Sequence, residues 1–352
     1  MNILYFYNNK IPNPMASSIQ VINTSHALAK LGHKVIFVCR HDQINDTRSL
    51  FAFYCLKPNI NFKIIRLHTP FGNGLFAQFC SSITAFLLGI YLVLFKRPRI
   101  LYFIGYSTFM LLFSILRPLR IKIVTELHQP YADRKYIKKK ILPALTTRKT
   151  IDLILTCSNT LKQFYISCGI DKKLIGFIQN GYNSGLFPKE HFRNRTKGMM
   201  QVKIPFDSED KILIYGGHLY FNRGPDLLIE AMEIVAQNIK RIKLVMLGGT
   251  IKADVDRVTD LIRAKKLQDT VYLTGYVAHN RVPDYLSIAD AGVVPMLDVR
   301  KHVYSNPLKI IEYMVCYLPV IAVDLPALKE VVNEQNGFLF KTGDKNSLAN
   351  AI

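Results

Sequence analysis

The sequence predicts an α/β protein that consists of two Rossmann-like domains. The chain has 352 residues, which is enough for two domains with full cores, and 49% of its residues are hydrophobic, which excludes a disordered chain. Short apolar runs suited to buried parallel strands form two series, and helix-like patterns alternate with them. A charged, turn-rich segment lies between the series. We therefore expect domains at 1–183 and 211–352, which face one another across a cleft, and a linker at 184–210.

The first series begins with a βαβ unit. An apolar strand is expected at 2–8, and it begins so early that no signal peptide is expected. Ser17 or Ser18 is expected to cap the following helix, Gly32 to end it, and the next strand to run over 34–40. Further strands of this series are expected at 62–68, 100–106, 122–128, 153–159 and 175–181.

The second series shows the same alternation. Its strands are expected at 211–217, 243–249, 271–277, 291–297, 318–323 and 337–340. Pro225 is expected at the start of a helix, because its missing N–H costs nothing in a first turn. A last helix is expected to begin near Asp344, and the chain ends inside it. The sequence is therefore expected to be either a fragment or a chain with an unusually short end.

One apolar stretch, 76–95, is uncharged and has the length of a helix that spans a bilayer. Lys96, Arg97 and Arg99 follow it, and 134–140 contains further basic residues. A true span would place its two flanks on opposite sides of a membrane and divide the strand order of the first domain. Two interpretations are therefore kept. One is a buried crossover helix, and the other is a helix that lies on an anionic membrane surface.

The chain is strongly basic, with 46 basic and 25 acidic residues and a formal net charge of +21. Such a surface favours anionic partners, but no motif typical of nucleic-acid recognition is present, so nucleic acid is not expected as a partner. The six cysteines form no CxxC pair, and no HExxH or Asp-x-Asp pattern occurs. We therefore expect free thiols, no metal and a reducing compartment. The cytoplasm is the expected location, either in solution or at the inner face of the membrane.

The first candidate site begins at Ser305-Asn306-Pro307, which has the composition of a helix start. Ser305 is expected to cap the helix and Pro307 to lie in its first turn. Lys309 and Glu312 are three residues apart and share a helix face. A helix N-terminus beside a lysine favours an anion such as phosphate, and Glu312 can accept a hydrogen bond from a sugar hydroxyl. The plain alternative is an ordinary capped helix with a surface Lys–Glu pair.

The second candidate site is a glycine turn. Gly216 and Gly217 end the strand at 211–217, and glycine there lets a ligand approach the backbone. Arg223 lies five residues beyond His218 and can reach the same anion. A glycine turn alone is a weak indication of a phosphate site.

His128 is the third candidate. It ends the strand at 122–128, at the sheet edge where ligands gather in open α/β folds. A single histidine is more often structural, so both roles stay open.

The order Ser-x-Pro-x-Lys-x-x-Glu-Tyr-Met, followed by Leu-Pro-Val-Ile-Ala, resembles the C-terminal signature of the retaining family 4 glycosyltransferases, which have the GT-B fold. The resemblance implies that a nucleotide diphosphate binds at the loop and helix start and that Glu312 binds the ribose. It also implies that His218 and Arg223 bind the diphosphate and that His128 contacts the donor sugar. The donor-binding residues implied in this way are Gly217, His218, Val277, Ser305, Asn306, Pro307, Leu308 and Glu312, and the catalytic residues are Arg223, Lys309 and His128.

Two departures from the family pattern concern the candidate sites of the second domain. Tyr304 stands where the family often has the first glutamate of a Glu-x7-Glu pattern, so whether a carboxylate contacts the donor sugar stays open. His218 stands where the family has an arginine, while Arg223 keeps the positive charge of the family's lysine.

The resemblance implies a retaining, metal-independent, hexosyltransferase-like enzyme without a cofactor. Such an enzyme moves a sugar from a UDP- or GDP-linked donor to a glycan or lipid-linked acceptor, in the synthesis of a cell-surface polysaccharide or lipid-linked glycan. Lys309 and Arg223 agree with this, because cations can stabilise the charge that grows as the diphosphate leaves. Two other classes stay open. One is a non-catalytic GT-B subunit that binds a nucleotide sugar or a partner transferase, and the other is a membrane-surface scaffold.

Overall fold

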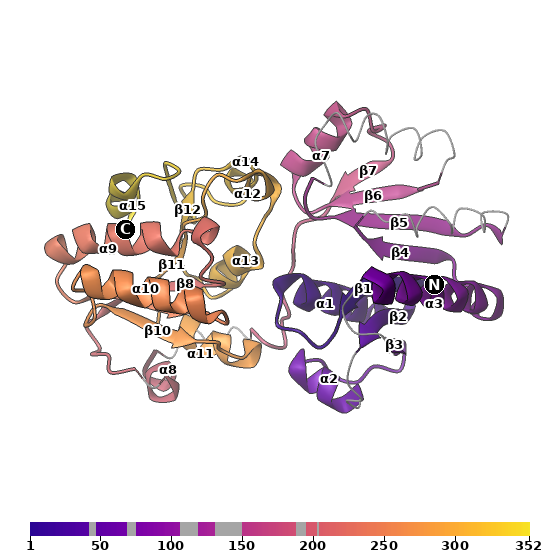
Figure 1. The fold of residues 1–352 in the computed structure, drawn as a ribbon, viewed down its shortest axis with the longest axis horizontal. Coiled ribbons are helices and arrows are strands. Elements are labelled where there is room, and N and C mark those ends of the chain that lie inside the picture. The colour runs from indigo at the N-terminus through magenta and orange to yellow at the C-terminus, as the bar shows by residue number, and fades with distance from the viewer. Residues whose placement is uncertain (42–46, 69–74, 106–118, 131–149, 188–194, 203) are drawn as a thin grey trace. The chain divides into compact units, whose positions relative to one another are not determined.

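The computed structural model describes residues 1–41, 47–68, 75–105, 119–130, 150–187, 195–202 and 204–352. The chain divides into two compact units, 1–179 and 180–352. Each unit is an α/β domain with one parallel sheet and its own hydrophobic core, as the sequence predicts (Figure 1). The segment expected as a linker, 184–210, is counted with the second unit and contains helix α8 (Arg195–Gln201).

The first domain has a seven-stranded parallel sheet in the order β3-β2-β1-β4-β5-β6-β7 (Figure 1). Its strands are β1 (Asn2–Lys10), β2 (Lys34–His41), β3 (Phe62–His68), β4 (Ile100–Ile104), β5 (Lys122–Leu127), β6 (Leu153–Thr156) and β7 (Ile175–Phe177). Each strand lies where an apolar run predicts one. Because β1 has β2 on one side and β4 on the other, the strand order reverses at the centre, as in a doubly wound sheet.

The described helices of the first domain are α1 (Ala16–Lys30), α2 (Thr47–Phe53), α3 (Leu75–Lys96) and α7 (Asn159–Ser167). The predicted serine cap of α1 is wrong, because its N-cap residue is Met15, which makes no side-chain capping bond. Ser18 lies inside the helix and is buried. Its hydroxyl is 2.8 Å from the hydroxyl of Tyr7, which supplies the partner that a buried hydroxyl needs. Gly32 follows the helix as predicted, with φ +85°.

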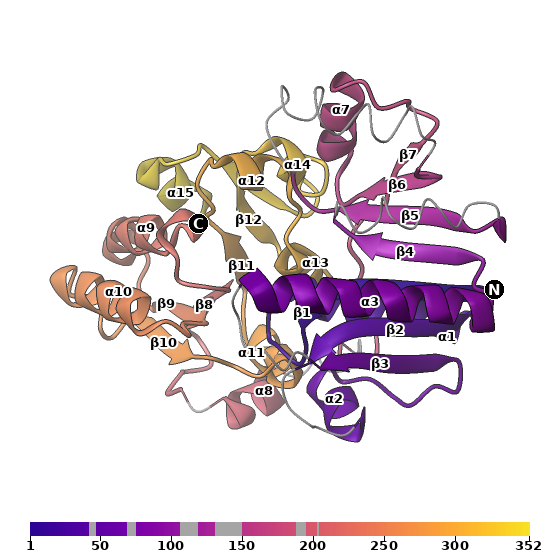
Figure 2. The same ribbon diagram turned by 45° about the vertical axis from the view of Figure 1, so that its right-hand side comes forward.

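Different helices cover the two faces of the first sheet. Successive strand residues point to opposite faces, so Tyr5 and Tyr7 share one face, where they join a core with Ile22 of α1. Helix α3 lies along one face of the sheet, in front of β1 and β2 in Figure 2. Its Leu92 lines a small cavity together with Leu4, whose side chain points away from the α1 face.

Helix α3 shows features of both interpretations of the stretch 76–95. Leu92 and Val93 are buried, as a crossover helix requires. Other large apolar side chains of this helix are exposed, namely Ile83, Leu87, Tyr91, Leu94 and Phe95. Within the described ranges, no helix has the length and apolar content that a membrane span requires. The basic run 134–140 lies outside the described residues.

The second domain has a six-stranded parallel sheet in the order β10-β9-β8-β11-β12-β13. Its strands are β8 (Lys211–Gly216), β9 (Ile242–Leu247), β10 (Val271–Gly275), β11 (Ala291–Val294), β12 (Val320–Val323) and β13 (Gly337–Phe340), all at predicted positions. Its helices and short 3-10 turns are η4 (Phe221–Arg223), α9 (Pro225–Asn238), α10 (Lys252–Ala264), η5 (His279–Arg281), α11 (Val282–Leu286), α12 (Arg300–Tyr304), α13 (Leu308–Val315), α14 (Pro326–Lys329) and α15 (Lys345–Ala351).

Helix α9 illustrates how this domain is held together. Pro225 is its first residue, as predicted, and Leu228, Met232 and Val235 recur on one side and are at most 3% exposed. Burial of one such side chain contributes about 1.5–3 kcal/mol, so packing rather than helix propensity fixes α9 on the sheet. The last helix, α15, begins just after Asp344, near its predicted start, and the side chain of Asp344 caps it.

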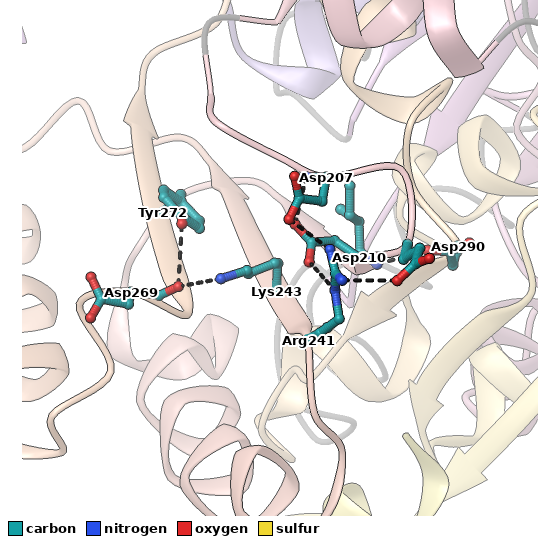
Figure 3. Close-up of polar contacts among 9 residues, drawn as sticks. Asp207, Asp210, Arg241, Lys243, Asp269, Tyr272 and Asp290 are labelled. Carbon is teal, nitrogen blue, oxygen red and sulfur yellow. Dashed lines mark hydrogen bonds and ion pairs between the residues drawn. The ribbon is translucent and has the colours of Figure 1, made fainter.

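Charged side chains connect the amino ends of neighbouring strands in the second sheet (Figure 3). Arg241, just before β9, donates to the carboxylates of Asp207, Glu209 and Asp210 at 2.6, 2.8 and 3.4 Å. Asp210 is buried and precedes β8, and Asp290, before β11, accepts from a β8 amide at 2.7 Å. These contacts hold the starts of three neighbouring strands.

Lys243 and Tyr272, near the starts of β9 and β10, form further contacts at this edge of the sheet (Figure 3). The side chains of Lys243 and Tyr272 both donate to the backbone oxygen of Asp269, at 2.7 and 3.2 Å. The ammonium group of Lys243 also lies 5.9 Å from the centre of the Tyr272 ring. The contacts in Figure 3 thus belong to the amino edge of the sheet, whereas ligands bind at the carboxyl edge in folds of this class.

The substitution Arg241→Ala is expected to lower the free energy of unfolding by about 1–2 kcal/mol, because it removes the cation beside the buried Asp210 carboxylate. Arg263, which pairs with Asp260 on the exposed face of α10, provides the matched control. For Arg263→Ala we expect a change below about 0.5 kcal/mol, as for most exposed ion pairs. Denaturant unfolding followed by far-ultraviolet circular dichroism measures both. Equal small effects would show that the Arg241 contacts add nothing beyond ordinary surface pairing.

Candidate active site

The residues predicted to bind the donor follow strands of the second sheet. Gly217, His218 and Arg223 follow β8, Val277 follows β10, and the segment 305–312 follows β11 through α12. The carboxyl ends of parallel strands lie on one edge of a sheet, and ligands bind at this edge in open α/β folds. The fold therefore brings segments that are far apart in the sequence to one place in the second domain.

The turn after β8 makes room for the ammonium group of Lys309. Gly217 has φ +146°, and a Cβ atom there would lie 2.7 Å from Lys309 Nζ. The same Nζ lies 4.6 Å from the centre of the Tyr215 ring, a cation–π contact. Gly248, just after β9, approaches the carbonyl of Gly217 so closely that no side chain would fit. These glycines permit the close approach of backbone and lysine.

Lys309 is a weak base in this environment. Burial and, to a lesser degree, the charge of Arg223 lower the pKa of Lys309 from 10.5 to about 7, although the charge of Glu312 acts in the opposite direction. Near neutral pH, the charged form of this lysine is therefore destabilised in the empty protein. A bound anion would compensate for the lost solvation and favour the charged form.

Arg223 is held beside Lys309 by two segments that touch. Its Nη1 atom donates to Met296 Sδ at 3.2 Å, a weak acceptor, and burial lowers the pKa of Arg223. Gly224 has φ +77°, and a side chain there would overlap the carbonyl of Pro295. The amide of Leu297 donates to the carbonyl of the residue before Arg223 at 3.0 Å. The turn that carries Arg223 and the loop after β11 are thus fixed on each other.

Two basic residues of α12, Lys301 and His302, belong to the same group. Burial lowers the pKa of each, and the charge of Arg223 lowers both further. The pKa of His218 is lowered in the same way, first by burial and then by the charges of Arg223 and Lys309. No motif or spacing in the sequence points to Lys301 and His302. Only the path of the chain after β11 places them here.

The basic cluster consists of His218, Arg223, Lys301, His302 and Lys309. In the described part of the chain, none of these five side chains forms a salt bridge with a carboxylate. The acidic residues that act on the cluster are Glu312, which raises the pKa of Lys309, and Asp254, which raises that of His218. The charged members of the cluster create a field that favours an anion with several charges, and a diphosphate has both the charge and the acceptor oxygens.

Glu312 has a partner that sequence patterns do not reveal. Nε2 of His279, in η5, lies 2.9 Å from Glu312 Oε1, and the two side chains are only 16% and 17% exposed. Nδ1 of His279 is buried without a hydrogen-bond partner among the described residues. The pair fixes one carboxylate oxygen and leaves the other able to accept from a hydroxyl group. Residues 279 and 312 have no sequence spacing that would link them, so only the fold identifies this pair.

The predicted helix start at Ser305 is wrong. Helix α12 ends at Tyr304 with Ser305 as its C-cap residue, and α13 begins at Leu308 with Pro307 as N-cap and no side-chain capping bond. The cause is the proline, which disfavours the helical conformation of the preceding Asn306 and so separates two helices. Lys309 and Glu312 still lie on the first turns of a helix, as predicted.

Contacts of α13 with the sheet fix its position. Gly292 of β11 lies against the ring of Tyr313, and a side chain there would overlap that ring. The hydroxyl of Tyr313 accepts from the amide of Gly216 at 2.9 Å. The carbonyl of Asn306 accepts from Asn180 Nδ2 at 2.6 Å, while its own Oδ1 is buried without a partner among the described residues. These contacts place Lys309 and Glu312 beside the end of β8.

Two predicted residues are not members of the basic cluster. Val277 packs against the core of the second domain just beyond β10. His128 belongs to the first domain, where it follows β5, and its Nε2 lies 2.8 Å from Glu126 Oε1.

Among the described residues, no group of three or more His, Cys, Asp or Glu side chains has an arrangement that could hold a metal ion. The described cysteines are free thiols, as the sequence predicts. They are Cys39, Cys55, Cys157, Cys168 and Cys316.

The substitution Lys309→Met is expected to stabilise the empty protein by about 1–2 kcal/mol at pH 7, because it removes a buried amine whose charged form is disfavoured. The pKa of about 7 lies below the unfolded value of 10.5, so the unfolded chain binds more protons between these pH values. The stability of the wild type should therefore rise with pH across this window, and the gain from Lys309→Met should shrink as pH approaches 10. Denaturant unfolding at several pH values measures the gain.

Lys243 provides the matched control, because it also lies near a tyrosine ring but at the opposite edge of the same sheet. Lys243→Met should give no gain at pH 7. A gain of equal size in both variants, or none in Lys309→Met, would contradict the assignment of a destabilised lysine to the candidate site.

Two family models match the chain. The model described as "Glycosyl transferases group 1" matches residues 198–352, and the model described as "Glycosyltransferase Family 4" matches residues 17–185. The first match covers the six strands of the second sheet and the whole basic cluster, and the second covers the strands of the first sheet from β2 to β7.

Relatives and solved structures agree with these matches. Mannosylfructose-phosphate synthase from Agrobacterium fabrum is 27% identical over 165 residues, which are 45% of this chain and 35% of that protein. The chain spans about a third of the length of the curated relatives it matches. Sucrose-phosphate synthase from Thermosynechococcus elongatus has a TM-score of 0.74 at 21% identity, over 99% of this chain and 88% of the other. HepE from Anabaena, solved in complex with UDP, has a TM-score of 0.71 at 16% identity, with the same coverage.

The structural likenesses show the GT-B fold, and the family models show the sequence relationship. The departures at His218 and Tyr304 change two positions within the site but leave the strand order, the glycine turn and the order of the motif residues unchanged. The chain therefore belongs to the family 4 glycosyltransferases.

Proposed function

We propose that this glycosyltransferase moves a sugar from a UDP- or GDP-linked donor to a hydroxyl group, with retention of the anomeric configuration. The observation that carries the proposal is the basic cluster, whose charges have no carboxylate partners among the described residues. A nucleoside diphosphate supplies the negative charge that this cluster favours, and it is also the leaving group of a sugar transfer. HepE, which shares the fold, was solved with UDP and with UDP-glucose.

In the proposed reaction, the bond between the sugar C1 and the diphosphate oxygen breaks, and the acceptor oxygen bonds to C1 on the same face. The proton of the acceptor passes to the leaving phosphate, and because the acceptor oxygen itself bonds to C1, no protein nucleophile takes part. Lys309 and Arg223 bind the diphosphate more strongly as its charge grows, which lowers the barrier. These fixed cations supply the charge stabilisation, and the proposed reaction therefore uses neither a metal ion nor a cofactor.

The remaining residues position the donor in this proposal. Glu312 accepts from the ribose through the oxygen that His279 does not hold. The backbone near Val277 contacts the base, and His128 contacts the donor sugar. The acceptor is a glycan or a lipid-linked sugar, and the product is a cell-surface polysaccharide or a lipid-linked glycan.

A two-stage experiment tests the proposed function. Thermal shifts with UDP, GDP, uridine and guanosine identify the nucleotide, because binding to the native state raises its stability. Incubation with UDP-glucose, UDP-galactose, UDP-N-acetylglucosamine and GDP-mannose, in the presence of EDTA, then shows whether a nucleotide is released, and NMR gives the anomeric configuration of the product. Binding without release from any donor would favour a non-catalytic subunit, and an inverted product would contradict the retaining mechanism.

We further propose that helix α3 of the first domain lies on an anionic membrane surface, where a lipid-linked acceptor would be reached. The exposed side chains Ile83, Leu87, Tyr91 and Leu94 recur every three or four residues and share one helix face, which we name the α3 face. Between 44% and 60% of each is exposed. Basic residues at 96, 97 and 99 follow the helix, and the net charge of +21 favours anionic lipid. An amphipathic helix of this kind lies in the membrane interface.

The substitution Arg223→Ala is expected to weaken UDP binding by about tenfold or more, because a hydrogen bond to a charged group contributes about 1.5–3 kcal/mol, and to leave uridine binding unchanged. Glu312→Ala in the same site is the matched control. It should weaken UDP and uridine alike, because both contain the ribose. Isothermal titration calorimetry measures the four affinities. An equal loss of UDP and uridine affinity in Arg223→Ala would contradict a phosphate role for Arg223.

The substitution Leu87→Asp is expected to weaken binding to vesicles of phosphatidylglycerol and phosphatidylcholine by about tenfold, because it places a charge on the α3 face. Leu31, which is 74% exposed at the end of α1, provides the matched control, and Leu31→Asp should bind like the wild type. Vesicle co-sedimentation measures binding, which should fall as salt rises. A wild type that ignores these vesicles at low salt would contradict the membrane proposal. The basic run that includes Lys138, Lys139 and Lys140 lies outside the described residues, so the test does not depend on it.

A further inference from the structure

The first domain contains a buried carboxylate at the carboxyl end of β5. Glu126 is 3% exposed and forms hydrogen bonds with three side chains. His128 Nε2, just after β5, lies 2.8 Å from Oε1, and Gln20 Nε2 of α1 donates to the same oxygen at 3.2 Å. The hydroxyl of Tyr102 in β4 donates to Oε2 at 2.6 Å. The carboxylate thus joins α1, β4 and β5 at the edge of the sheet where ligands bind in this fold class.

This carboxylate is ionised at neutral pH. Burial alone would raise the pKa of Glu126, but the hydrogen bonds from His128 and Tyr102 help to bring it below its ordinary value. In the described part of the chain, no lysine or arginine forms a salt bridge with Glu126. A buried charge is costly unless it is hydrogen-bonded, so the contacts with His128 and Tyr102 are what make an ionised Glu126 tolerable in the sheet.

The contact with Glu126 determines which ring nitrogen of His128 carries a proton. An ionised carboxylate can only accept, so His128 Nε2 must donate and must be protonated. Nδ1 is then the nitrogen that remains for another partner. The side chain of His128 is 24% exposed, whereas that of Glu126 is 4% exposed, so a ligand can reach the ring but not the carboxylate. The backbone oxygen of His128 accepts from Cys157 Sγ at 3.6 Å, which holds the end of the strand.

We propose that Glu126 is a positioning residue for sugar transfer, which fixes the ring of His128 through Nε2 so that Nδ1 accepts a hydrogen bond from a hydroxyl of the donor sugar. This inference rests on the proposed function, in which His128 contacts that sugar. Tyr102 and Gln20 hold the carboxylate in turn, so the ring is oriented before the substrate binds. A hydrogen-bonded carboxylate behind a histidine fixes both the tautomer and the ring orientation in other enzyme sites.

Proton NMR of the full chain tests the geometry without any substrate. A ring N–H that donates to a buried carboxylate exchanges slowly with water, so we expect an observable Nε2–H signal in protein with ¹⁵N-labelled histidine. The signal is assigned to His128 by its loss in His128→Gln, and it should disappear or broaden in Glu126→Leu. A His128 ring that is protonated at Nδ1 in the wild type, or that has no protected Nε2–H, would overturn the inference.

A double-mutant cycle tests whether Glu126 acts through His128. With the nucleotide sugar that the wild type turns over, Glu126→Gln is expected to lower kcat by about tenfold to a hundredfold, with little change in KM or in the affinity for UDP. In the His128→Gln background, Glu126→Gln should have no further effect on kcat. Factors that multiply in the double variant would mean that Glu126 serves the fold alone, and would overturn the inference.

Two further variants keep this test decisive. Asp152→Asn is the matched control, because Asp152 is a carboxylate beside the same sheet that accepts from the amide of Ile123 at 2.9 Å. It should change neither the ring signal nor kcat. If Glu126→Gln fails to fold, Tyr102→Phe removes one hydrogen bond from the carboxylate and should lower kcat by a smaller factor.

The failure of this inference can be told from the failure of the proposed function. Turnover by the wild type with no loss in Glu126→Gln would overturn the role of Glu126 and leave the transferase function standing. A wild type that turns over none of the nucleotide sugars would overturn the proposed function. In that case the ring signal would still show whether Glu126 holds His128 through Nε2.

Discussion

The second domain depends on one electrostatic constraint, which is that basic side chains are gathered at the carboxyl edge of its sheet and, among the described residues, form no salt bridge with a carboxylate. Lys309 lies beneath the glycine turn after β8 and close to Arg223, and both have lowered pKa values because they are buried. The same domain does contain carboxylates that pair with a cation, because Arg241 at the amino edge forms salt bridges with three of them. Ion pairs thus hold strands together at one edge of the sheet, whereas basic side chains at the other edge stay available for a ligand.

The strands could be predicted from the sequence because both faces of these sheets are covered, so each strand is a continuous apolar run. Helix boundaries could not be predicted as well. The capping residues expected at Ser18 and Ser305 do not cap, because Ser18 is buried against Tyr7 and because Pro307 separates two helices. Cap residues are common within three residues of any helix start, so composition alone does not select the one that the fold uses.

The candidate site was predictable only in part, for a related reason. Gly217, Arg223, Lys309 and Glu312 stand in segments with recognisable spacing. Lys301, His302 and His279 do not, and they join the site through the paths of α12 and η5 after their strands. Glu126 is an intermediate case. An acidic residue inside the apolar strand that ends at His128 was a visible signal, because a charge is seldom placed in a strand that is buried on both faces unless it has partners.

The contact between the turn that carries Arg223 and the loop after β11 has a consequence for the release of product. Gly224 lies against the carbonyl of Pro295, the amide of Leu297 donates to the neighbouring turn, and Arg223 donates to Met296. Because of these contacts, we expect the two segments to move together. For a donor bound as proposed, the spent nucleotide has to dissociate from the same charges that held the donor. Product inhibition would then be inherent in this architecture, and sustained synthesis would require a second reaction that removes the nucleotide.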